Sequence, residues 1–588
     1  MKTDTKHPIP TLPAWCAAAL LCATTSGAPT VRAQPAPAPT APAAPPATVP
    51  AAPSTTTGIA TTESNADDSR LRQQTELYNS GLAALESAKT EAKNGGADAV
   101  ARRLAEAADS FEKTLQIAPD DAMARVLLGY VRLKQERYDD ALTNLRMIAG
   151  SKALDVKTRA VVQNNIGMAL WNKKDFKLAL PAYEAATTLD KDYADARYNL
   201  AFALLAQARA ADALPHFTLL LSRNKRDPLL HDGLGQAHES MGEWDKAFAS
   251  YREAIRLNPR DSSYPLNLGL ALLRSDPDGK IKGRRNSAVP PLREAIRLNP
   301  EAAPAYLQLG LMYIDKKNWP GAQNMLRQYA SLRPDDFVGQ FNLGLAYDYS
   351  SRFDDALRHY AIAEKLQPTD PATRNNIGRI NLKRAEKEPK SLDEAIAKFR
   401  EALNLDPDFV DARNNLALAL TQRGDLDAAG TEWKRLIASA NRQLKATPDP
   451  GKRNAIFTRV VSARAALAEN YLKARMYADA AEEYKRLLAI SKKNIAAMSN
   501  LGLALYNTRQ YLDALKAYDR IVKLGAVATN KVPRDQLAIA YNNRGVVLEA
   551  MKKVPDALAS YKKAIEIQPD YAEAKTNRER LIAGTVVG

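Results

Sequence analysis

One alanine position recurs about every 34 residues through most of this chain, and it limits the possible folds more than any other feature. The repeats begin near Leu71, and the position has thirteen members: Ala107, Ala141, Ala179, Ala213, Ala247, Ala288, Ala322, Ala356, Ala395, Ala429, Ala480, Ala514 and Ala557. Self-similarity at a fixed period of roughly 20–50 residues is typical of arrays in which each small unit stacks on the next. The sequence therefore predicts one repeat array rather than several independent globular domains.

Three further positions recur at fixed distances from this alanine. An aromatic residue usually follows it by four residues, as at Tyr183, a glycine usually precedes it by twelve, as at Gly167, and a proline often follows it by twelve, as at Pro259. The spacing of the glycine, alanine and aromatic residues is helical. Small residues let two helix axes approach closely, and proline cannot continue a helix. Each unit is therefore predicted to hold two amphipathic helices of about a dozen residues.

This pattern resembles the tetratricopeptide repeat (TPR) family, and the resemblance covers roughly Leu71–Pro569. It implies an all-α fold, a right-handed TPR superhelix (α-solenoid) of about 13 helix pairs over residues 71–570. The first helix of each pair is expected to line the concave surface. Residues 571–588 are expected to form a polar capping helix and tail. Insertions are expected at residues 94–96, 274–286, 383–391, 437–463 and 525–536.

Residues 1–33 have the layout of a secretory signal peptide. Two lysines precede a ten-residue apolar core, Ala14–Ala23, and Val31-Arg32-Ala33 supplies small residues at a cleavage site. The core is shorter than the ~20 apolar residues that a membrane span needs, and we expect no transmembrane span in the mature chain. We therefore expect an exported, periplasmic protein. Secretion, a lipid anchor on Cys22 and a retained cytoplasmic leader are the alternatives, although Leu21 is larger than the residue that lipidation requires before its cysteine.

The composition after the leader bounds the remaining possibilities. Residues 34–70 are rich in Ala and Pro and then in polar residues, which predicts a disordered linker. Both cysteines of the chain, Cys16 and Cys22, lie in the leader, so the mature chain is expected to lack disulfides, thiolate zinc sites and cysteine nucleophiles.

An amide recurs two residues before the glycine position and is the leading candidate for a peptide-binding surface. Its members are Asn165, Asn199, Asn267, Gln308, Asn342, Asn376, Asn415, Asn500 and Asn543. Asparagine is a poor residue for a helix interior, so its persistence needs another cause. An amide both donates and accepts hydrogen bonds and so matches a peptide backbone, and TPR proteins that grip extended peptides use such a row. The alternative is that each amide bonds to a neighbouring repeat.

Two other surfaces are weaker candidates. A mostly apolar row lies one helical turn further along, where it either contacts a partner or packs helix against helix: Met168, Phe202, Leu270, Leu311, Leu345, Leu418 and Leu503. The insertion at residues 274–286 contains Lys280, Lys282, Arg284 and Arg285, which either bind an anionic partner or form a solvated loop. We expect no nucleic-acid partner, because the leader indicates export and charges elsewhere alternate in sign.

Catalytic patterns are not found in the sequence. His231 and His238 are seven residues apart, too far along a helix to share a zinc ion, and Gly279-Lys280 lacks the rest of a phosphate-binding loop. We therefore expect neither an enzyme nor a cofactor. A leader followed by a TPR array is similar in layout to periplasmic proteins of motility, pilus and secretion machines. The sequence thus predicts a non-catalytic exported scaffold that binds proteins or extended peptides in its concave groove, with an anionic envelope polymer or carbohydrate as the alternative ligand.

The signal peptide gives the first testable prediction. We expect the mature chain to begin near Gln34, because cleavage follows the small residue Ala33. An Ala33→Arg replacement should slow cleavage by placing a large charge at the cleavage site. Intact-mass measurement on the purified protein checks both expectations, and a chain that retains Met1 or carries a lipid on Cys22 would contradict them.

Overall fold

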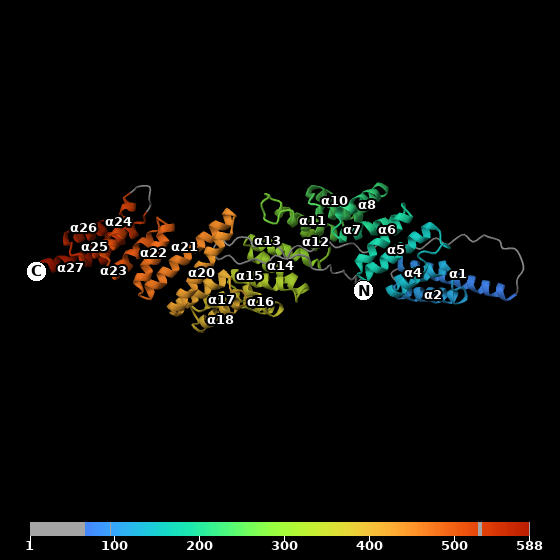
Figure 1. Ribbon diagram of the computed structural model, residues 1–588, viewed down its shortest axis with the longest axis horizontal. Coiled ribbons are helices and arrows are strands. Elements are labelled where there is room, and N and C mark those ends of the chain that lie inside the picture. The colour runs from blue at the N-terminus through green and yellow to red at the C-terminus, as the bar shows by residue number, and fades with distance from the viewer. Residues whose placement is uncertain (1–64, 94–95, 527–531, 587–588) are drawn as a thin grey trace. The chain divides into compact units, whose positions relative to one another are not determined.

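The computed structural model describes residues 65–93, 96–526 and 532–586, so the predicted signal peptide and most of the predicted linker lie outside the described residues. Within these ranges the chain forms 27 α-helices, one 3₁₀-helix and no β-strand (Figure 1). The helices follow one another as thirteen pairs and a final single helix, which confirms the predicted all-α repeat architecture. The first helix begins at Asn65, so residues 65–70, which we had placed in the linker, are helical.

The two helices of each pair form separate sets. The first helices are α1 (Asn65–Lys93), α3 (Ala122–Lys134), α5 (Val156–Asn172), α7 (Ala194–Ala206), α9 (Pro228–Ser240), α11 (Ser263–Arg274), α13 (Ala303–Asp315), α15 (Phe337–Tyr349), α17 (Pro371–Arg384), α19 (Val410–Arg423), α21 (Pro450–Lys473), α23 (Ile495–Asn507) and α25 (Arg534–Ala550). The second helices are α2 (Ala97–Ile117), α4 (Tyr138–Ile148), α6 (Phe176–Leu189), α8 (Ala210–Arg223), α10 (Trp244–Leu257), α12 (Val289–Leu298), α14 (Trp319–Leu332), α16 (Phe353–Leu366), α18 (Lys390–Leu405), α20 (Leu426–Ala446), α22 (Tyr477–Ile490), α24 (Tyr511–Gly525) and α26 (Val554–Ile567). The 3₁₀-helix η1 (Arg285–Ala288) precedes α12, and α27 (Ala572–Val586) ends the array.

Contacts divide the described chain into two units, one ending at Leu309 and the other beginning at Gly310. In each unit a helix packs mainly on the helices directly before and after it in the sequence. This is the expected behaviour of a solenoid, in which each repeat contacts only its neighbours. A continuous core in the first unit runs from Ala84 to Ala237, and one in the second unit runs from Ala395 to Val547.

The recurring alanine and glycine positions explain how each pair packs. All thirteen alanines are 0% exposed. The glycine lies directly under the aromatic ring of its own pair: a Cβ on Gly167 would be 2.6 Å from the Tyr183 ring, and one on Gly344 would be 2.8 Å from the Tyr360 ring. Because van der Waals contact begins near 3.5 Å, no larger residue fits there unless the ring moves. The ring therefore packs between the two helices of its own pair.

Two kinds of turn set the helix starts. Several first helices begin after an Asp or Asn whose side chain caps the helix, as where Asp336 Oδ1 accepts a 2.8 Å hydrogen bond from the Gly339 amide. Ten of the thirteen second helices begin two residues after a residue with positive φ, which is Gly242 before α10 and Gly424 before α20. The same turn position in eight other pairs holds a larger residue: Glu136, Lys174, Ala208, Lys317, Ser351, Arg475, Arg509 and Lys552.

The predicted insertions take different forms. Residues 275–284 form a loop before η1, and residues 385–389 form a short connection between α17 and α18. The insertion at residues 437–463 is helical except at residues 447–449, and it lengthens α20 to 21 residues and α21 to 24. The insertions at residues 94–96 and 525–536 fall partly outside the described residues.

The turn position gives a prediction with a matched pair of variants. A residue other than glycine at positive φ costs about 1–2 kcal/mol of conformational energy. Ala208→Gly should therefore raise the free energy of unfolding by up to ~1 kcal/mol, since glycine also loses more entropy on folding. Gly242→Ala at the same position of the next pair should lower it by about 1 kcal/mol. Urea denaturation followed by circular dichroism measures both, and destabilisation by Ala208→Gly would contradict the assignment of strain to this turn.

Candidate functional site

The recurring amides lie on the first helices, and most of them are inaccessible to solvent. Six are buried and three are half-buried. The half-buried members are Asn415, Asn500 and Asn543, all in the last four pairs. A buried amide needs hydrogen-bond partners within the protein, so the partners of each amide indicate what it does.

Three of the amides donate to a polar side chain on the first helix of the preceding pair. Asn199 Nδ2 donates to Asn164 Oδ1 at 2.8 Å, Asn267 Nδ2 to Asp232 Oδ1 at 2.9 Å, and Asn415 Nδ2 to Asn375 Oδ1 at 2.9 Å. Each acceptor stands three residues before the glycine position of its own pair. These bonds join neighbouring repeats.

Three others bond to a tyrosine at the aromatic position of the preceding pair. Asn376 Nδ2 donates to the Tyr360 hydroxyl at 3.3 Å, and Asn500 Nδ2 donates to the Tyr484 hydroxyl at 3.0 Å. Asn543 hydrogen-bonds Tyr518 in the same way. Burial raises the pKa of Tyr484 to about 12, so its hydroxyl stays protonated and neutral at physiological pH.

The remaining three amides follow pairs that have neither a polar acceptor nor a tyrosine at these two positions. In the pairs before Asn165, Gln308 and Asn342 the aromatic position holds a leucine: Leu145, Leu292 and Leu326. The position three residues before the glycine, which supplies the acceptor in other pairs, is also apolar there: Val126, Leu266 and Leu307. Among the described residues, neither side-chain polar atom of Asn165 has a hydrogen-bond partner, and the same holds for Gln308 Nε2. Asn342 Nδ2 donates at 2.8 Å to Val338 O of its own helix. The residues of the preceding pair therefore decide what each amide contacts.

The structure thus gives six of the nine amides a role between repeats, and their binding of a peptide stays a prediction. The same rule extends to α27, where Asn577 Nδ2 donates to Asn542 Oδ1 at 3.0 Å. We did not predict a role for Asn577 or for the four acceptors, Asn164, Asp232, Asn375 and Asn542. Their polar character at one fixed position before the glycine is the signal that identifies them.

Asp232 is the most strongly perturbed group of this network. It is buried and accepts hydrogen bonds from Gln236 Nε2 at 2.7 Å and from Asn267. Burial raises the pKa of Asp232 to about 7, because the two hydrogen bonds offset only part of the cost of placing a charge there. About two turns further along α9, Glu239 accepts a 2.7 Å hydrogen bond from the Tyr251 hydroxyl and pairs with Arg274.

A second polar cluster joins α15 and α17 in the second unit. Asp348 is buried and pairs with Arg379 and, at 3.7 Å, with Lys383 Nζ. Burial raises the pKa of Asp348 even though both cations favour its charged form. The Arg379 guanidinium also lies 5.3 Å from the centre of the Tyr349 ring. These contacts cross from one repeat to the next, as the amide bonds do.

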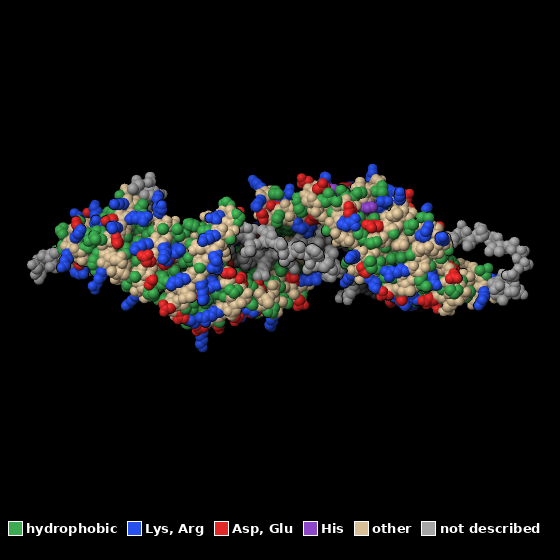
Figure 2. Space-filling model, in the orientation of Figure 1, with side chains coloured by type: hydrophobic (Ala, Val, Ile, Leu, Met, Phe, Trp, Pro, Cys, Tyr) green, Lys and Arg blue, Asp and Glu red, His purple; other side chains and the backbone are tan. Residues whose placement is uncertain are grey.

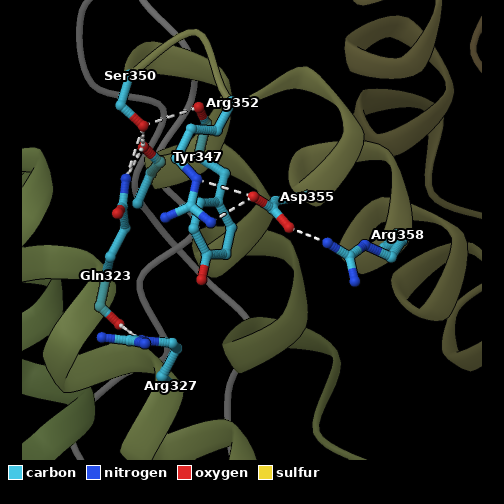
Figure 3. A network of polar contacts seen from close by, with 8 residues as sticks. Gln323, Arg327, Tyr347, Ser350, Arg352, Asp355 and Arg358 are labelled. Atoms are coloured by element: carbon cyan, nitrogen blue, oxygen red, sulfur yellow. Dashed lines mark hydrogen bonds and ion pairs between the residues drawn. The ribbon is translucent and has the colours of Figure 1, made fainter.

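The turn between α15 and α16 carries a further polar network (Figure 3). Gln323 Nε2 donates to Ser350 Oγ at 2.6 Å, and Arg352 Nε donates to Asp355 Oδ2 at 2.8 Å. A pocket beside this turn is lined by Ser351, Arg352, Phe353, Asp354, Asp355, Arg384 and Glu388. Its bases pair with its own acids, Arg352 with Asp355 and Arg384 with Asp354. The pairs leave little charge in the pocket for a ligand.

The apolar row divides into a buried and an accessible part. Five members are buried: Met168, Phe202, Leu270, Leu311 and Leu345. Leu418 is 45% exposed and Leu503 is 44% exposed. Both stand three residues after a half-buried amide, Asn415 or Asn500, so an accessible amide and an accessible leucine occur together on α19 and on α23.

The basic loop at residues 274–286 is largely balanced by acids. Lys280 Nζ lies 2.7 Å from Asp278 Oδ2, and Arg284 lies 3.9 Å from Asp245 and 5.6 Å from the centre of the Phe248 ring. Lys282 is exposed and Arg285 is half-buried. Figure 2 shows Lys and Arg side chains interspersed with Asp and Glu over much of the visible surface.

Groups suited to metal chemistry do not converge in the described residues. No three His, Cys, Asp or Glu side chains there form a cluster that could hold a metal ion. His238 Nδ1 lies 2.6 Å from Glu243 Oε2, and His231 Nε2 lies 3.0 Å from Lys225 O. No helix in the described part of the chain is long and apolar enough to cross a membrane.

Comparison with known proteins identifies the repeat. Profiles described as tetratricopeptide repeat match residues 85–153, 164–228, 228–261, 465–529 and 538–571, and one described as TPR repeat matches residues 385–424. The human protein O-mannosyl-transferase TMTC3 is 24% identical over 284 residues, which are 46% of this chain and 28% of that protein. The Caenorhabditis elegans tetratricopeptide repeat-containing protein trd-1 is 22% identical over 151 residues, 26% of this chain and 19% of its own. The chain thus spans less than a third of either curated relative.

Among solved structures, a tetratricopeptide repeat protein from Parabacteroides merdae is similar to part of the chain. It has 14% sequence identity and a TM-score of 0.34, and the match covers 47% of this chain and 99% of that one.

Because the preceding pair decides whether an amide has a hydrogen-bond partner, replacing two neighbouring amides should have different effects on stability. Asn199→Leu should lower the free energy of unfolding by ~1–3 kcal/mol, because it removes a buried hydrogen bond and leaves Asn164 Oδ1 without its donor. Asn165→Leu should leave stability unchanged or raise it by about 1–3 kcal/mol, because it removes an amide that has no partner. Leucine is close enough to asparagine in size that a large cavity is avoided. Thermal unfolding of both variants measures the difference, and equal destabilisation would refute the rule.

Proposed function

Because this chain belongs to the tetratricopeptide repeat family, we propose that it is a non-catalytic scaffold or adaptor that binds an extended segment of a protein partner. TPR arrays serve as protein-interaction scaffolds. We place the binding surface for this partner on the first helices of the last four pairs, along α19 and α23.

The accessible pairs Asn415–Leu418 and Asn500–Leu503 carry this proposal. In each pair Nδ2 of the amide donates to the preceding repeat, and none of the described groups donates to its Oδ1. The leucine lies one turn further on the same helix face. An extended peptide offers backbone N–H groups to such an oxygen and apolar side chains to such a leucine.

We further propose that this scaffold acts outside the cytoplasm, within a cell-envelope assembly of the motility, pilus or secretion type. The support is the signal-peptide layout of residues 1–33 and the Ala/Pro-rich segment that follows it. A spacer of that composition extends by ~3.1 Å per residue. Such a spacer would separate the repeat array from the N-terminus of the mature chain.

Site-specific photo-crosslinking in the native host tests the binding face. A benzoylphenylalanine side chain replaces Leu503 in one variant, Leu418 in a second and Leu512 in a third. Leu512 is the matched control because it is 64% exposed and lies on a second helix, α24. We expect the same protein adduct from the first two variants and none from the third.

The partner found in this way allows the affinity to be measured. Leu503→Glu should weaken its binding at least about tenfold, because the complex would bury an unpaired charge, while Leu512→Glu should leave the affinity unchanged. Equal adducts at all three positions, or none at Leu418 and Leu503, would contradict the proposed face.

A further inference from the structure

Most of the net charge of this chain lies in its last repeats. The whole chain has 83 Lys and Arg against 67 Asp and Glu, for a net charge of +16. Residues 426–588 contain 28 Lys and Arg against 16 Asp and Glu, whereas residues 1–425 contain 55 against 51. This asymmetry begins at α20, the first of the two helices that the insertion at residues 437–463 lengthens.

The excess is concentrated at the junctions between a second helix and the next first helix. When each loop is counted with four residues on either side, the junctions α14–α15, α16–α17 and α18–α19 have net charges of −1, 0 and −2. The junctions α20–α21, α22–α23 and α24–α25 have +2 each, and the last, α26–α27, returns to −2. Three successive junctions therefore differ in sign from those on both sides.

These junctions lie along one edge of the second unit. Helices in an antiparallel array alternate in direction, so every second helix ends on the same edge. Contacts join successive junctions there: Arg442 Nη2 of α20 lies 3.6 Å from Asp408 of the preceding junction, and Arg520 Nη2 of α24 donates to Lys492 O at 2.6 Å. In Figure 1 the α20–α21 tip and the end of α24 lie on the same side of this unit.

The side chains at this edge are accessible. We name the basic edge as Arg442, Lys445, Lys492, Lys493, Arg520 and Lys523, all of which are exposed. Arg453 is exposed too, but it donates to Leu444 O at 2.6 Å and Thr447 O at 3.2 Å and so holds the α20–α21 turn.

The lengthened pair raises part of this edge above the rest. Helix α20 has 21 residues where α22 has 14. At 1.5 Å per residue the extra seven residues add about 10 Å. The extension carries Arg442 and Lys445, and Phe457 on its α21 side is 39% exposed. Cations and an exposed ring thus project from the array.

We propose that the basic edge is a docking surface for the anionic headgroups of a lipid bilayer. Its charges stand on separate turns in a row, where a fluid surface can supply one headgroup to each cation. Each Lys or Arg near such a surface contributes favourably to binding. This inference goes beyond the proposed function, because it concerns a different face and a different class of partner.

Cosedimentation of the full mature chain with lipid vesicles tests the proposal. We expect binding to vesicles of phosphatidylcholine with 30% phosphatidylglycerol and none to phosphatidylcholine alone. Binding should weaken steeply with added salt, since exposed charges are screened over about 10 Å at 0.1 M.

Two double variants distinguish the contribution of the basic edge to vesicle binding from the contribution of the net charge. Lys492→Glu with Lys493→Glu should weaken vesicle binding at least about tenfold. Lys552→Glu with Lys553→Glu is the matched control, because these exposed lysines lie at the α25–α26 turn on the opposite edge and the change in charge is the same. The control should alter binding less than about twofold, with circular dichroism melting curves used to confirm that both variants fold.

Three results would overturn the proposal. They are equal losses in the two double variants, no binding of the wild-type chain to the anionic vesicles, and binding to a polyglutamate peptide that exceeds binding to the vesicles. The last result would assign the edge to an acidic protein segment.

Discussion

The contact between an aromatic ring and the glycine of its own helix pair is the constraint on which the rest of the array depends. The ring of Tyr360 lies so close to Gly344 that no Cβ fits between them, and the fully buried Ala356 one turn before it keeps the second helix close. With the ring fixed in this way, its hydroxyl reaches Asn376 of the next pair. One side chain therefore joins the two helices of a pair and sets the position of the next.

The pairs that lack this ring show what it contributes. Leucine stands at the aromatic position before Asn165, Gln308 and Asn342, and none of these amides bonds to the preceding aromatic position. Where the ring is present but is a phenylalanine, as at Phe399, an amide at the other acceptor position takes over and Asn375 accepts from Asn415. The polar contact between repeats thus has two interchangeable forms.

Much of this architecture was predictable because it depends on side-chain size at fixed spacing. The thirteen recurring alanines correspond to the thirteen helix pairs of the structure. The helical character of residues 437–463 was not foreseen, since an insertion interrupts the 34-residue period whether it forms a loop or extends two helices. The role of the amides remained open because their partners lie 16, 25, 35 or 40 residues earlier, on another repeat, where the sequence shows no contact.

Function is better sought where the last repeats depart from the pattern of the others. Helix α23 shows two departures: Leu503 is exposed where most of its counterparts are buried, and Lys492-Lys493 precede the helix where acids precede α15 and α19. From Ile495, the first residue of α23, to Leu503 the helix rises about 12 Å, which exceeds the ~8 Å over which salt screens charges at physiological ionic strength. The two surfaces therefore act nearly independently, although one lies on α23 and the other directly before it. Added salt should release the chain from an anionic surface while leaving an apolar contact at Leu503 in place, because burial of apolar area does not depend on charge screening.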